Sequence, residues 1–268
     1  MALVSSSTWR PARIIANRPV ANGSMWLTLE AADGLPAEFE PGHVLGLGLP
    51  QEHGYLRHAY TVSRGEPERH RFEHLYRIIP HGRMSPQLAE QFSGGTVYFH
   101  GPFHTPIQRE IQRDAGSIVL IATGAGIGPI FGYAEKALRE GETRPIFLYA
   151  GFREVSDICL SEELNELSLR HTNLAWEFSL TRPPRGWMGL HGRVTECVPQ
   201  QLDRSHLHSS HFHLVGNGEM VHLVRRALAR AGVSPGRVSI ETYFNHNFAP
   251  AESQIDVLAE QFRARSNS

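Results

Sequence analysis

Cysteine is scarce in this chain of 268 residues. Its two cysteines, Cys159 and Cys197, are far apart and form no Cys-x-x-Cys pair. Iron–sulfur clusters and cysteine-bound zinc need several thiolates at short spacings, so the sequence has no ligand set for either group. A chain of this composition that handles electrons must use another carrier.

Long apolar runs and an excess of charge are also missing. No stretch approaches the roughly 20 apolar residues of a membrane span, and Met1–Arg10 lacks the apolar segment of a signal peptide. The 26 Lys and Arg residues balance 27 Asp and Glu residues, which leaves a formal charge of -1. No general attraction to nucleic acid or to anionic lipid follows. We therefore expect a protein of a reduced, cytoplasmic compartment that binds neither nucleic acid nor membranes.

The first hundred residues alternate between short β-type runs and turns rich in Gly, Pro and Asn. The chain length predicts two domains, at roughly 100–200 residues each. Short strands at even spacing are typical of a small antiparallel barrel, here with six strands. The six runs are Arg13–Ile15, Met25–Leu29, His43–Gly48, His58–Val62, Phe72–Ile79 and Thr96–Phe99.

After about Asp114 the pattern changes to apolar strands that alternate with helical stretches. This alternation predicts a parallel α/β sheet, so the fold class is β + α/β. We place the domains at residues 1–107 and 108–245, followed by an extension, 246–268. Ile255, Leu258 and Phe262 recur there at helical spacing and predict a helix. The alternating segments are Ser117–Ala122, Ile130–Glu140, Pro145–Ala150, Leu160–Leu169, Leu174–Leu180, Phe212–Val215 and Met220–Ala231.

Two glycine-rich turns end predicted strands of the second domain. The strand within Ile118–Pro129 runs into Gly124-Ala125-Gly126, and Leu214–Met220 forms a second junction of strand, glycine and helix. Glycines let the backbone approach a pyrophosphate, and a helix start supplies free N–H groups. The first turn alone is also compatible with a plain structural turn, but two such turns at one sheet edge favour a ligand site. The candidate nucleotide-binding residues are Thr123, Gly124, Gly126, Ile127, Gly216, Asn217 and Met220.

These two segments and their spacing resemble the ferredoxin–NADP reductase family of flavin-dependent oxidoreductases, in its bacterial type. In that family a flavin-binding barrel precedes a pyridine-nucleotide domain. The resemblance covers roughly Arg13 to Phe244 and implies FAD and NADP as cofactors.

Three barrel segments carry the flavin part of this resemblance. Arg57–Val62 resembles the family's Arg-x-Tyr-Ser/Thr strand, which implies that Tyr60 lies against the isoalloxazine and that the Thr61 hydroxyl approaches flavin N5. Gly82–Ser85 resembles the turn that holds the flavin phosphate, and His100–Phe103 resembles the Gly-Pro step that ends the barrel. Taken alone, Tyr60 and Thr61 are also ordinary strand residues. The candidate flavin-binding residues are Arg57, His58, Tyr60, Thr61, Val62, Tyr76, Arg77, Ile78, Gly82, Arg83, Met84, Ser85, Tyr243 and Phe244.

The sequence departs from the family pattern two residues before the tyrosine. The family has a phosphate-pairing arginine at that position, which here is His58, with Arg57 one step earlier. Neighbouring side chains of a strand point to opposite faces, so both cannot reach the flavin unless a β-bulge intervenes. We expect such a bulge, with Arg57 on the phosphate, because a guanidinium is the better phosphate partner.

The resemblance also selects a site for the 2'-phosphate of NADP. Its positions are Arg153, Thr181, Arg182 and Arg193, three arginines and a hydroxyl near strand ends. Such a set suits a dianion, whereas an NAD-specific pocket more often carries an acidic partner for the ribose. The alternative is that Arg182 and Arg185, on either side of Pro183 and Pro184, are solvated loop residues.

Ile240–Phe244 resembles the last strand of the family, which implies that Glu241 and Tyr243 lie beside the flavin. Together with Tyr60 and Thr61, these two form our candidate catalytic set. Many relatives have a cysteine where this chain has Val215, and its absence suggests altered geometry rather than lost function. We also expect the tail after Tyr243 to restrain the approach of nicotinamide to the flavin, with Ile255, Leu258 and Phe262 pinning the tail against the barrel.

Histidine is abundant, with 16 residues, and His206, His208, His211 and His213 cluster in sequence. Histidine pairs can bind metal, but no acidic or cysteine partner lies near this cluster in sequence. We therefore expect a structural or solvated cluster and no metal site.

Together these features predict an NADPH-dependent flavoprotein reductase. Hydride would pass from NADPH to FAD, and the electrons would pass to a separate ferredoxin, flavodoxin or oxygenase component. Two alternatives remain, because a fold does not fix a function. One is a non-catalytic regulatory module that binds flavin or nucleotide, and the other is a reductase of free flavin.

Overall fold

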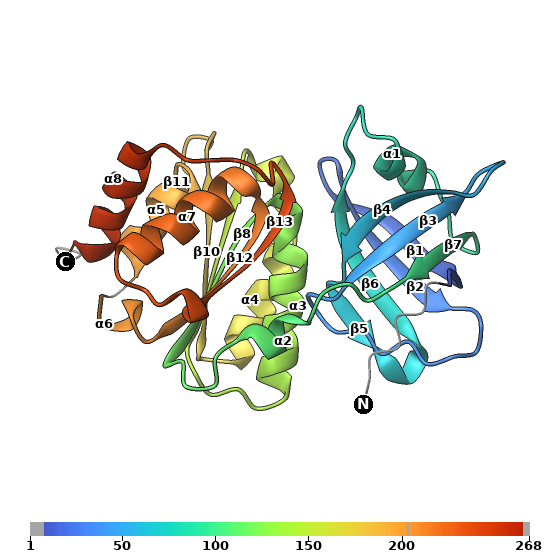
Figure 1. Ribbon diagram of the computed structural model, residues 1–268, viewed down its shortest axis with the longest axis horizontal. Coiled ribbons are helices and arrows are strands. Elements are labelled where there is room, and N and C mark those ends of the chain that lie inside the picture. Colours follow the sequence, from blue (N-terminus) through green and yellow to red (C-terminus); the bar gives the residue numbers. More distant parts are fainter. Residues whose placement is uncertain (1–7, 203, 265–268) are drawn as a thin grey trace.

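The chain forms two sheets that lie side by side (Figure 1). The computed structural model describes residues 8–202 and 204–264, so the ends of the expected first domain and of the extension lie outside the described residues. The first sheet is antiparallel and has seven strands, and the second is parallel and has six strands with helices on both faces. The predicted β + α/β fold is thereby confirmed. In the described part of the chain, no helix is long and apolar enough to cross a membrane.

The antiparallel sheet has one strand more than the six that we predicted. The additional strand, β5, has only three residues and includes Gly65, so no alternation of apolar and polar residues marks it in the sequence. The strands are ordered β4-β3-β7-β1-β2-β6-β5. Their bounds are β1 Arg10–Ala21, β2 Ser24–Ala31, β3 Val44–Pro50, β4 Tyr55–Thr61, β5 Arg64–Glu66, β6 Arg71–Arg77 and β7 Thr96–His100.

The end of strand β4 turns back onto β6 and so curls the sheet into a barrel. The N–H of Ser63 donates to the carbonyl of Glu73 at 2.7 Å, and Nδ1 of His74 donates to the carbonyl of Thr61 at 2.8 Å. Inside, Phe39, Phe72 and Phe99 meet edge to face with ring centroids 5.0–5.7 Å apart. The barrel core therefore holds the β4 end that carries Tyr60 and Thr61.

The parallel sheet is ordered β11-β10-β9-β8-β12-β13. Its strands are β8 Ser117–Thr123, β9 Ile146–Phe152, β10 Leu174–Leu180, β11 Leu190–His191, β12 Ser210–Asn217 and β13 Val238–Phe244. The α-helices of the chain are α1 Met84–Ala89, α2 Ile107–Glu110, α3 Ile127–Arg139, α4 Ser161–Arg170, α5 Val194–Gln201, α6 Arg204–Leu207, α7 Gly218–Arg230 and α8 Glu252–Arg263. Short 3-10 helices span Pro67–Arg69, Gly124–Gly126, Val155–Asp157 and Pro235–Arg237.

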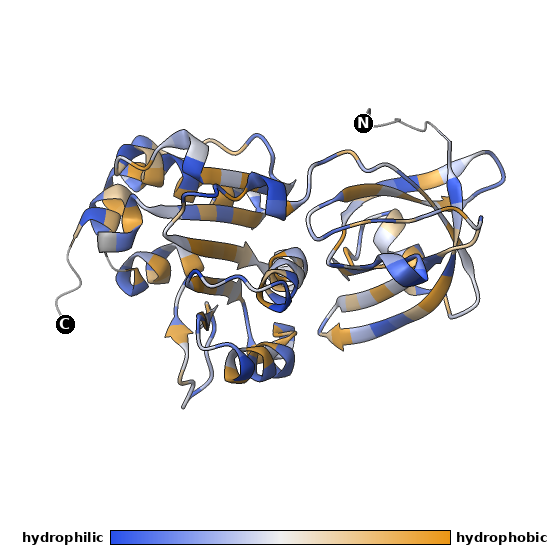
Figure 2. Cartoon of the chain, turned by 90° about the horizontal axis from the view of Figure 1, so that it is seen from below, coloured by the Kyte–Doolittle hydropathy of each residue, from blue (hydrophilic) through white to orange (hydrophobic). Residues whose placement is uncertain are grey.

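Successive residues of the central strand β8 enter two different cores, because strand side chains alternate between faces. Leu120 packs in one core with residues of α3 and α4, and Val119 packs in the other with residues of α5, α7 and α8. In Figure 2 the central strands are largely apolar, whereas the helices carry both polar and apolar residues. A strand that is buried on both faces reads as a continuous apolar run, which is why this strand was predicted correctly.

Helix α3 joins the two sheets, because its glycines let it approach the barrel (Figure 1). A Cβ on Gly132 would lie 1.7 Å from the carbonyl oxygen of Ser63, and a Cβ on Gly128 would lie 2.4 Å from the Ser63 hydroxyl. Beside this contact Arg64 binds both carboxylate oxygens of Glu135, at 2.7 and 2.8 Å. The junction therefore combines close backbone contact with a bidentate ion pair.

The tail contains the predicted helix, α8, but this helix does not touch the barrel. Leu258 and Phe262 are buried in the core that α5 and α7 share, and Ile255 is buried as well. Figure 1 shows α8 at the end of the molecule away from the barrel. Our expectation that these three residues pin the tail against the barrel is therefore wrong. An apolar stripe predicts that a helix is packed, but it does not identify the surface that receives it.

Candidate functional site

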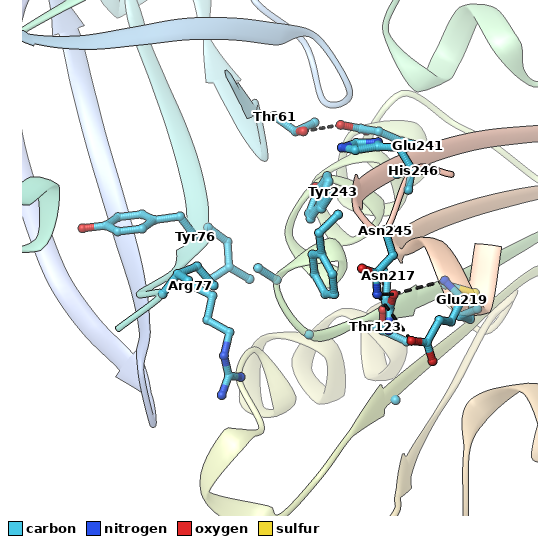
Figure 3. Close-up of a pocket in the computed structure, with 18 of the residues that line it drawn as sticks. Thr61, Tyr76, Arg77, Thr123, Asn217, Glu219, Glu241, Tyr243, Asn245 and His246 are labelled. Carbon is cyan, nitrogen blue, oxygen red and sulfur yellow. Dashed lines mark hydrogen bonds between the residues drawn. The ribbon is translucent and has the colours of Figure 1, made fainter. Parts of the chain in front are cut away.

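A large cleft lies between the barrel and the carboxyl edge of the parallel sheet. Its volume is about 1440 Å³, whereas sites for one small molecule usually measure about 300–1,000 Å³. Strand β4 and helix α1 contribute residues from the barrel, and β8, β12 and β13 contribute residues from the sheet. Figure 3 shows Tyr76 and Arg77 on one side of this cleft and Thr123 and Asn217 on the other.

The cleft brings together most residues that the sequence selected. Those that line it are Arg57, His58, Tyr60, Thr61, Tyr76, Arg77, Gly82, Arg83, Met84, Ser85, Thr123, Gly124, Arg153, Thr181, Arg193, Asn217, Met220, Glu241, Tyr243 and Phe244. Six selected residues do not line it, namely Val62, Ile78, Gly126, Ile127, Arg182 and Gly216. Val62 and Ile127 are instead fully buried core residues.

Tyr60 presents a buried hydroxyl to the barrel side of the cleft. Its ring packs edge to face on Tyr76 at 5.8 Å, and its oxygen has no hydrogen-bond partner among the described residues. Burial raises the pKa of Tyr60 far above its usual value. The neighbouring Tyr76 differs, because its hydroxyl donates to Asn17 at 3.1 Å. A buried phenol without a partner is costly unless a ligand supplies one, so this position suits a cofactor with polar groups.

Strand β4 contains no bulge, contrary to our expectation. Its pairing with β3 runs in continuous register from Val44 opposite Thr61 to Pro50 opposite Tyr55. Regular alternation therefore places His58 on the face of Tyr60, with ring centroids 5.7 Å apart, and Arg57 on the opposite face. The predicted bulge is wrong because it assumed that the arginine had to share the face of Tyr60.

A hydroxyl in the first turn of α1 fixes the turn that precedes this helix. Ser85 is buried and its Oγ accepts the N–H of Ile79 at 2.9 Å. Gly82 packs closely on the same residue, since a Cβ there would lie 3.1 Å from the carbonyl oxygen of Ile79. The loop between these residues is therefore held in one shape at the cleft wall.

Thr61 and Glu241 meet where the barrel faces β13. The Thr61 hydroxyl donates a hydrogen bond to Oε1 of Glu241 (Figure 3). Burial raises the pKa of Glu241 to about 7, although the bond from Thr61 acts in the opposite direction. Behind Thr61, burial lowers the pKa of His74 to about 4, so this histidine is neutral when it donates from Nδ1 to the Thr61 carbonyl. The site thus pairs a held hydroxyl with a carboxyl group that titrates near neutrality.

The two glycine-rich turns pack directly against each other. Thr123 Oγ1 accepts the N–H of Asn217 at 2.9 Å, and a Cβ on Gly216 would lie 2.4 Å from that same oxygen. A Cβ on Gly126 would lie 2.6 Å from the carbonyl oxygen of Val215. Gly124 differs, because it has a φ of +55° and open space beside its Cα. Of the glycines predicted in these turns, Gly124 is the one that lines the cleft and leaves room for a ligand.

The predicted arginines lie at the sheet end of the cleft, but they are not equivalent. Arg153, Thr181 and Arg193 line the cleft, whereas Arg182 lies outside it and is 72% exposed. Arg182 is 3.4 Å from Glu154 and is held by a backbone bond to the carbonyl of Arg153 at 2.8 Å.

A buried hydroxyl without a hydrogen-bond partner also lies at this end of the cleft. Ser179 contributes its Oγ to the wall, and no partner for it occurs within residues 8–202 and 204–264. Sequence reasoning missed Ser179, because nothing distinguishes it from other serines in apolar strands. Its unsatisfied hydroxyl suits a polar ligand, as that of Tyr60 does at the other end.

Asn245 is a second cleft residue that the sequence did not reveal. It has a φ of 57°, and its Nδ2 donates to Oδ1 of Asn217 at 3.2 Å and to Oε1 of Glu219 at 3.4 Å (Figure 3). Glu219 in turn lies 3.9 Å from Arg193. The available signal was an asparagine directly after a strand, since asparagine tolerates the left-handed conformation.

His211 and His213 are buried, and His213 has an acidic partner from a distant part of the sequence. Both bind Ser239 Oγ, at 2.9 and 2.6 Å, and His213 Nδ1 lies 3.3 Å from Oε2 of Glu110. Within the described residues, no group of three or more His, Cys, Asp or Glu side chains is arranged to hold a metal ion.

Comparisons with known proteins agree with this geometry. The model of the oxidoreductase NAD-binding domain matches residues 120–226. Ferredoxin–NADP reductase B of Sorangium cellulosum is 30% identical over 238 residues, which are 87% of this chain and 96% of that protein. The ferredoxin–NAD(P)(+) reductase component of a naphthalene 1,2-dioxygenase/salicylate 5-hydroxylase system of Ralstonia sp. is 28% identical over 78% of this chain, which spans only 62% of that longer protein.

Among solved structures, a ferredoxin NADP+ reductase from Neisseria gonorrhoeae with bound FAD and NADP shares the fold. The TM-score is 0.76 at 20% sequence identity, and the match covers 89% of this chain and all of the other, 100%.

Proposed function

The chain belongs to the ferredoxin–NADP reductase family, and from this premise we propose that it is an NADPH-dependent flavoprotein reductase. The bound flavin supplies the chemistry, because it accepts a hydride and releases electrons one at a time. The barrel, residues 1–107, binds FAD, and residues 108–245 bind NADPH. A separate ferredoxin, flavodoxin or oxygenase component receives the electrons.

One observation carries this proposal, namely the continuity of the cleft. The flavin end with Tyr60 and the nucleotide end with Gly124 belong to one cavity of about 1440 Å³. Each end also has a buried hydroxyl that lacks a partner in the described part of the chain, on Tyr60 and on Ser179. A cavity of this size with unsatisfied groups at both ends suits two dinucleotides that meet in the middle. Thr61 and Glu241 lie where the rings would meet.

At the flavin end, Tyr60 and His58 share one face of β4. We place the isoalloxazine against Tyr60, with the flavin phosphates against His58, Arg83 and the held turn before α1. Two separate stretches that contact phosphate suit FAD better than FMN.

At the nucleotide end, the arginines favour NADPH over NADH. Arg153 and Arg193 line the cleft beside Thr181. Glu219 lies 3.9 Å from Arg193, beyond hydrogen-bond distance, so the guanidinium donors of Arg193 remain for a 2'-phosphate. A phosphate dianion bound by two forked donors gains charge-assisted hydrogen bonds that a ribose hydroxyl does not. Arg182 contributes less in this arrangement, because Glu154 already pairs with it.

The test begins with the purified full-length chain and its cofactor. Extraction should yield FAD, and recovery of FMN alone would contradict the flavin assignment. Anaerobic addition of NADPH should bleach the flavin absorbance rapidly, and addition of NADH should do so more slowly. An unchanged spectrum with both nucleotides would favour the regulatory module over the reductase.

The rival within the enzyme class, a reductase of free flavin, is tested by gel filtration. We expect FAD to stay with the protein at concentrations far below those of free-flavin assays. Loss of the flavin on the column, with activity restored by added flavin, would favour that rival. Electron transfer to candidate ferredoxins and flavodoxins then identifies the acceptor class.

A further inference from the structure

Polar side chains lie on a face of the parallel sheet where apolar residues are expected. On the side of β12 and β13 that carries Val215, the alternate positions hold His211, His213, Ser239 and Glu241. His213 is paired with Ser239 across the ladder, and Val215 is paired with Glu241. The two histidines are almost completely buried, at 1% exposure each. Buried polar groups are costly unless they are satisfied, so such a row calls for a function.

The hydrogen bonds among these four side chains leave one ring nitrogen of His213 without a partner in the described part of the chain. His211 Nδ1 accepts the N–H of Gln112 at 3.3 Å, so a neutral His211 has its proton on Nε2 and donates it to Ser239 at 2.9 Å. The Ser239 hydroxyl then donates to Nδ1 of His213 at 2.6 Å. A neutral His213 therefore has its proton on Nε2, which is buried and has no partner among the described residues.

Glu110 from helix α2 faces this histidine. Its Oε2 is buried and lies 3.3 Å from His213 Nδ1, in a geometry that makes no hydrogen bond. Burial alone would raise the pKa of Glu110, but His213, His104 and Ser239 together hold it below the usual value. An ionised carboxylate and a basic ring nitrogen are thus in contact, with a hydrogen bond between them still unmade. A proton can be taken up at this point without any rearrangement of the backbone.

The other oxygen of Glu110 leads to solvent. Oε1 accepts a hydrogen bond from Thr105 at 3.4 Å and lies 3.7 Å from Nε2 of His104. The side chain of His104 is 40% exposed and lines the cleft. His104 belongs to the linker between β7 and α2, residues 101–106. This linker runs close to Thr61, because the Phe103 N–H donates to the carbonyl of Val44, the ladder partner of Thr61.

Glu241 is the next member of the row on strand β13. It follows Ser239 by two residues on the same face, a separation of about 7 Å. The charge of His104 in the linker lowers the pKa of Glu241, and the charge of Glu110 in α2 raises it. Tyr243 and Thr61 are its other close neighbours. A planar ring against Thr61 would cover the cleft side of Glu241, and the row would then be its remaining route to water.

We propose that Glu110, together with His213 and His104, is the relay through which Glu241 exchanges a proton with solvent. The inference rests on the proposed function. Each NADPH gives up a hydride, which is two electrons and one proton, and becomes NADP+. When the two electrons leave singly to two acceptor molecules, the proton must reach water. Glu110 and His213 act through Glu241 and are positioning residues, not catalytic ones. Two further charged groups, Arg144 and Arg237, face the row and act on His211.

The first experiment does not depend on turnover. The carboxyl band of Glu241 is followed by infrared spectroscopy against pH in the oxidised flavoprotein without NADPH, and Glu241→Gln identifies the band. In Glu110→Gln the midpoint should move to lower pH, because a neighbouring negative charge is gone. In His104→Asn it should move to higher pH. The matched control is Glu162→Gln, an exposed acid in the first turn of α4. An unchanged midpoint in both Glu110→Gln and His104→Asn would overturn the proposal.

The second experiment follows the proton itself. In weak buffer, the full-length protein turns over NADPH with ferricyanide, two ferricyanides being reduced and one proton released per NADPH. A pH-indicator dye reports proton release and ferricyanide absorbance reports electron transfer. In the wild type the two should keep pace, whereas in Glu110→Gln proton release should slow by about a hundred-fold, the lower end of what general acid–base groups contribute. Equal rates in Glu110→Gln would contradict the relay. Failure of the wild type to oxidise NADPH would contradict the proposed function, while the infrared titration would still test the row. His104→Asn serves where Glu110→Gln does not fold.

Discussion

The Thr61 hydroxyl and the Glu241 carboxylate are hydrogen-bonded across the cleft, although 180 positions separate them in the sequence. Thr61 ends the barrel strand β4 and Glu241 lies in β13, so the bond links the two sheets. Burial also raises the pKa of Glu241 to about 7. Its protonation therefore affects both the junction of the two sheets and the chemistry of the cleft.

Glu241→Gln should remove part of the pH dependence of stability. The pKa of Glu241 is raised from 4.5 to about 7 in the folded protein, so its contribution is fully present below the unfolded value and is lost as pH rises through 7. The linked free energy is on the order of 3 kcal/mol, at 1.36 kcal/mol per unit. Urea unfolding at pH 5 and pH 8 should show this fall in the wild type and a smaller one in the variant. Equal falls in both proteins would mean that Glu241 is ionised throughout.

His74 should have the opposite effect. Its pKa is lowered to about 4 by burial, so its contribution to stability is fully present above about 6.5 and is lost as pH falls through 4. His74→Leu should cost about 1 kcal/mol at pH 8, because the bond to the Thr61 carbonyl is lost. It should be less sensitive to acid than the wild type when unfolding is compared at pH 7 and pH 4.5. The exposed His53→Leu is the control and should leave the acid sensitivity unchanged.

Gly132→Ala should separate the barrel from helix α3 or unfold the junction. A methyl group there would lie 1.7 Å from the carbonyl oxygen of Ser63, and overpacking of this kind costs about 1–3 kcal/mol or more. The control is Gly236→Ala, where nothing lies within 4 Å of the added carbon. The midpoint temperature of thermal unfolding should fall for Gly132→Ala only. That variant should also retain less flavin. A Gly132→Ala protein as stable as the wild type would show that α3 can shift without loss.

Arg193→Ala should weaken NADPH binding and spare NADH. A charge-assisted hydrogen bond is worth about 1.5–3 kcal/mol, which corresponds to a roughly ten- to hundred-fold loss of affinity. Arg182→Ala should lose less, because Glu154 already neutralises that guanidinium at 3.4 Å. Arg170→Ala, at an exposed site on α4, is the control. Dissociation constants for both nucleotides decide the matter, and equal losses for NADPH and NADH would assign Arg193 to the shared pyrophosphate.

Phe262→Ala should destabilise the protein without changing NADPH affinity. Phe262 is buried between α8 and the core of α5 and α7, and truncation of a buried phenylalanine costs about 3–5 kcal/mol. Denaturant unfolding measures the loss, and flavin-fluorescence titration measures the affinity. A gain in NADPH affinity would revive the idea that the tail restrains nicotinamide.

The sequence predicted the order of the elements and many of the residues that line the cleft, because both depend on local patterns. Apolar runs such as Ser117–Ala122 and the motif around Tyr60 are visible within a few residues. Contacts between distant segments are not visible in this way. The partner of His213 is Glu110, roughly a hundred positions earlier, and no spacing rule connects them. The predicted bulge next to Arg57 was wrong for a related reason, since the register of β4 is set by β3.

The contact between Gly132 and the Ser63 backbone also has an evolutionary consequence. Main chain meets main chain at that point, so the closest approach of the two halves is set by backbone atoms. Most residues on the cleft walls take no part in this contact, so a lineage can exchange one nucleotide or redox partner for another without resizing the gap. The constraint is concentrated instead in one turn of α3, where selection should tolerate little besides glycine at two positions four residues apart.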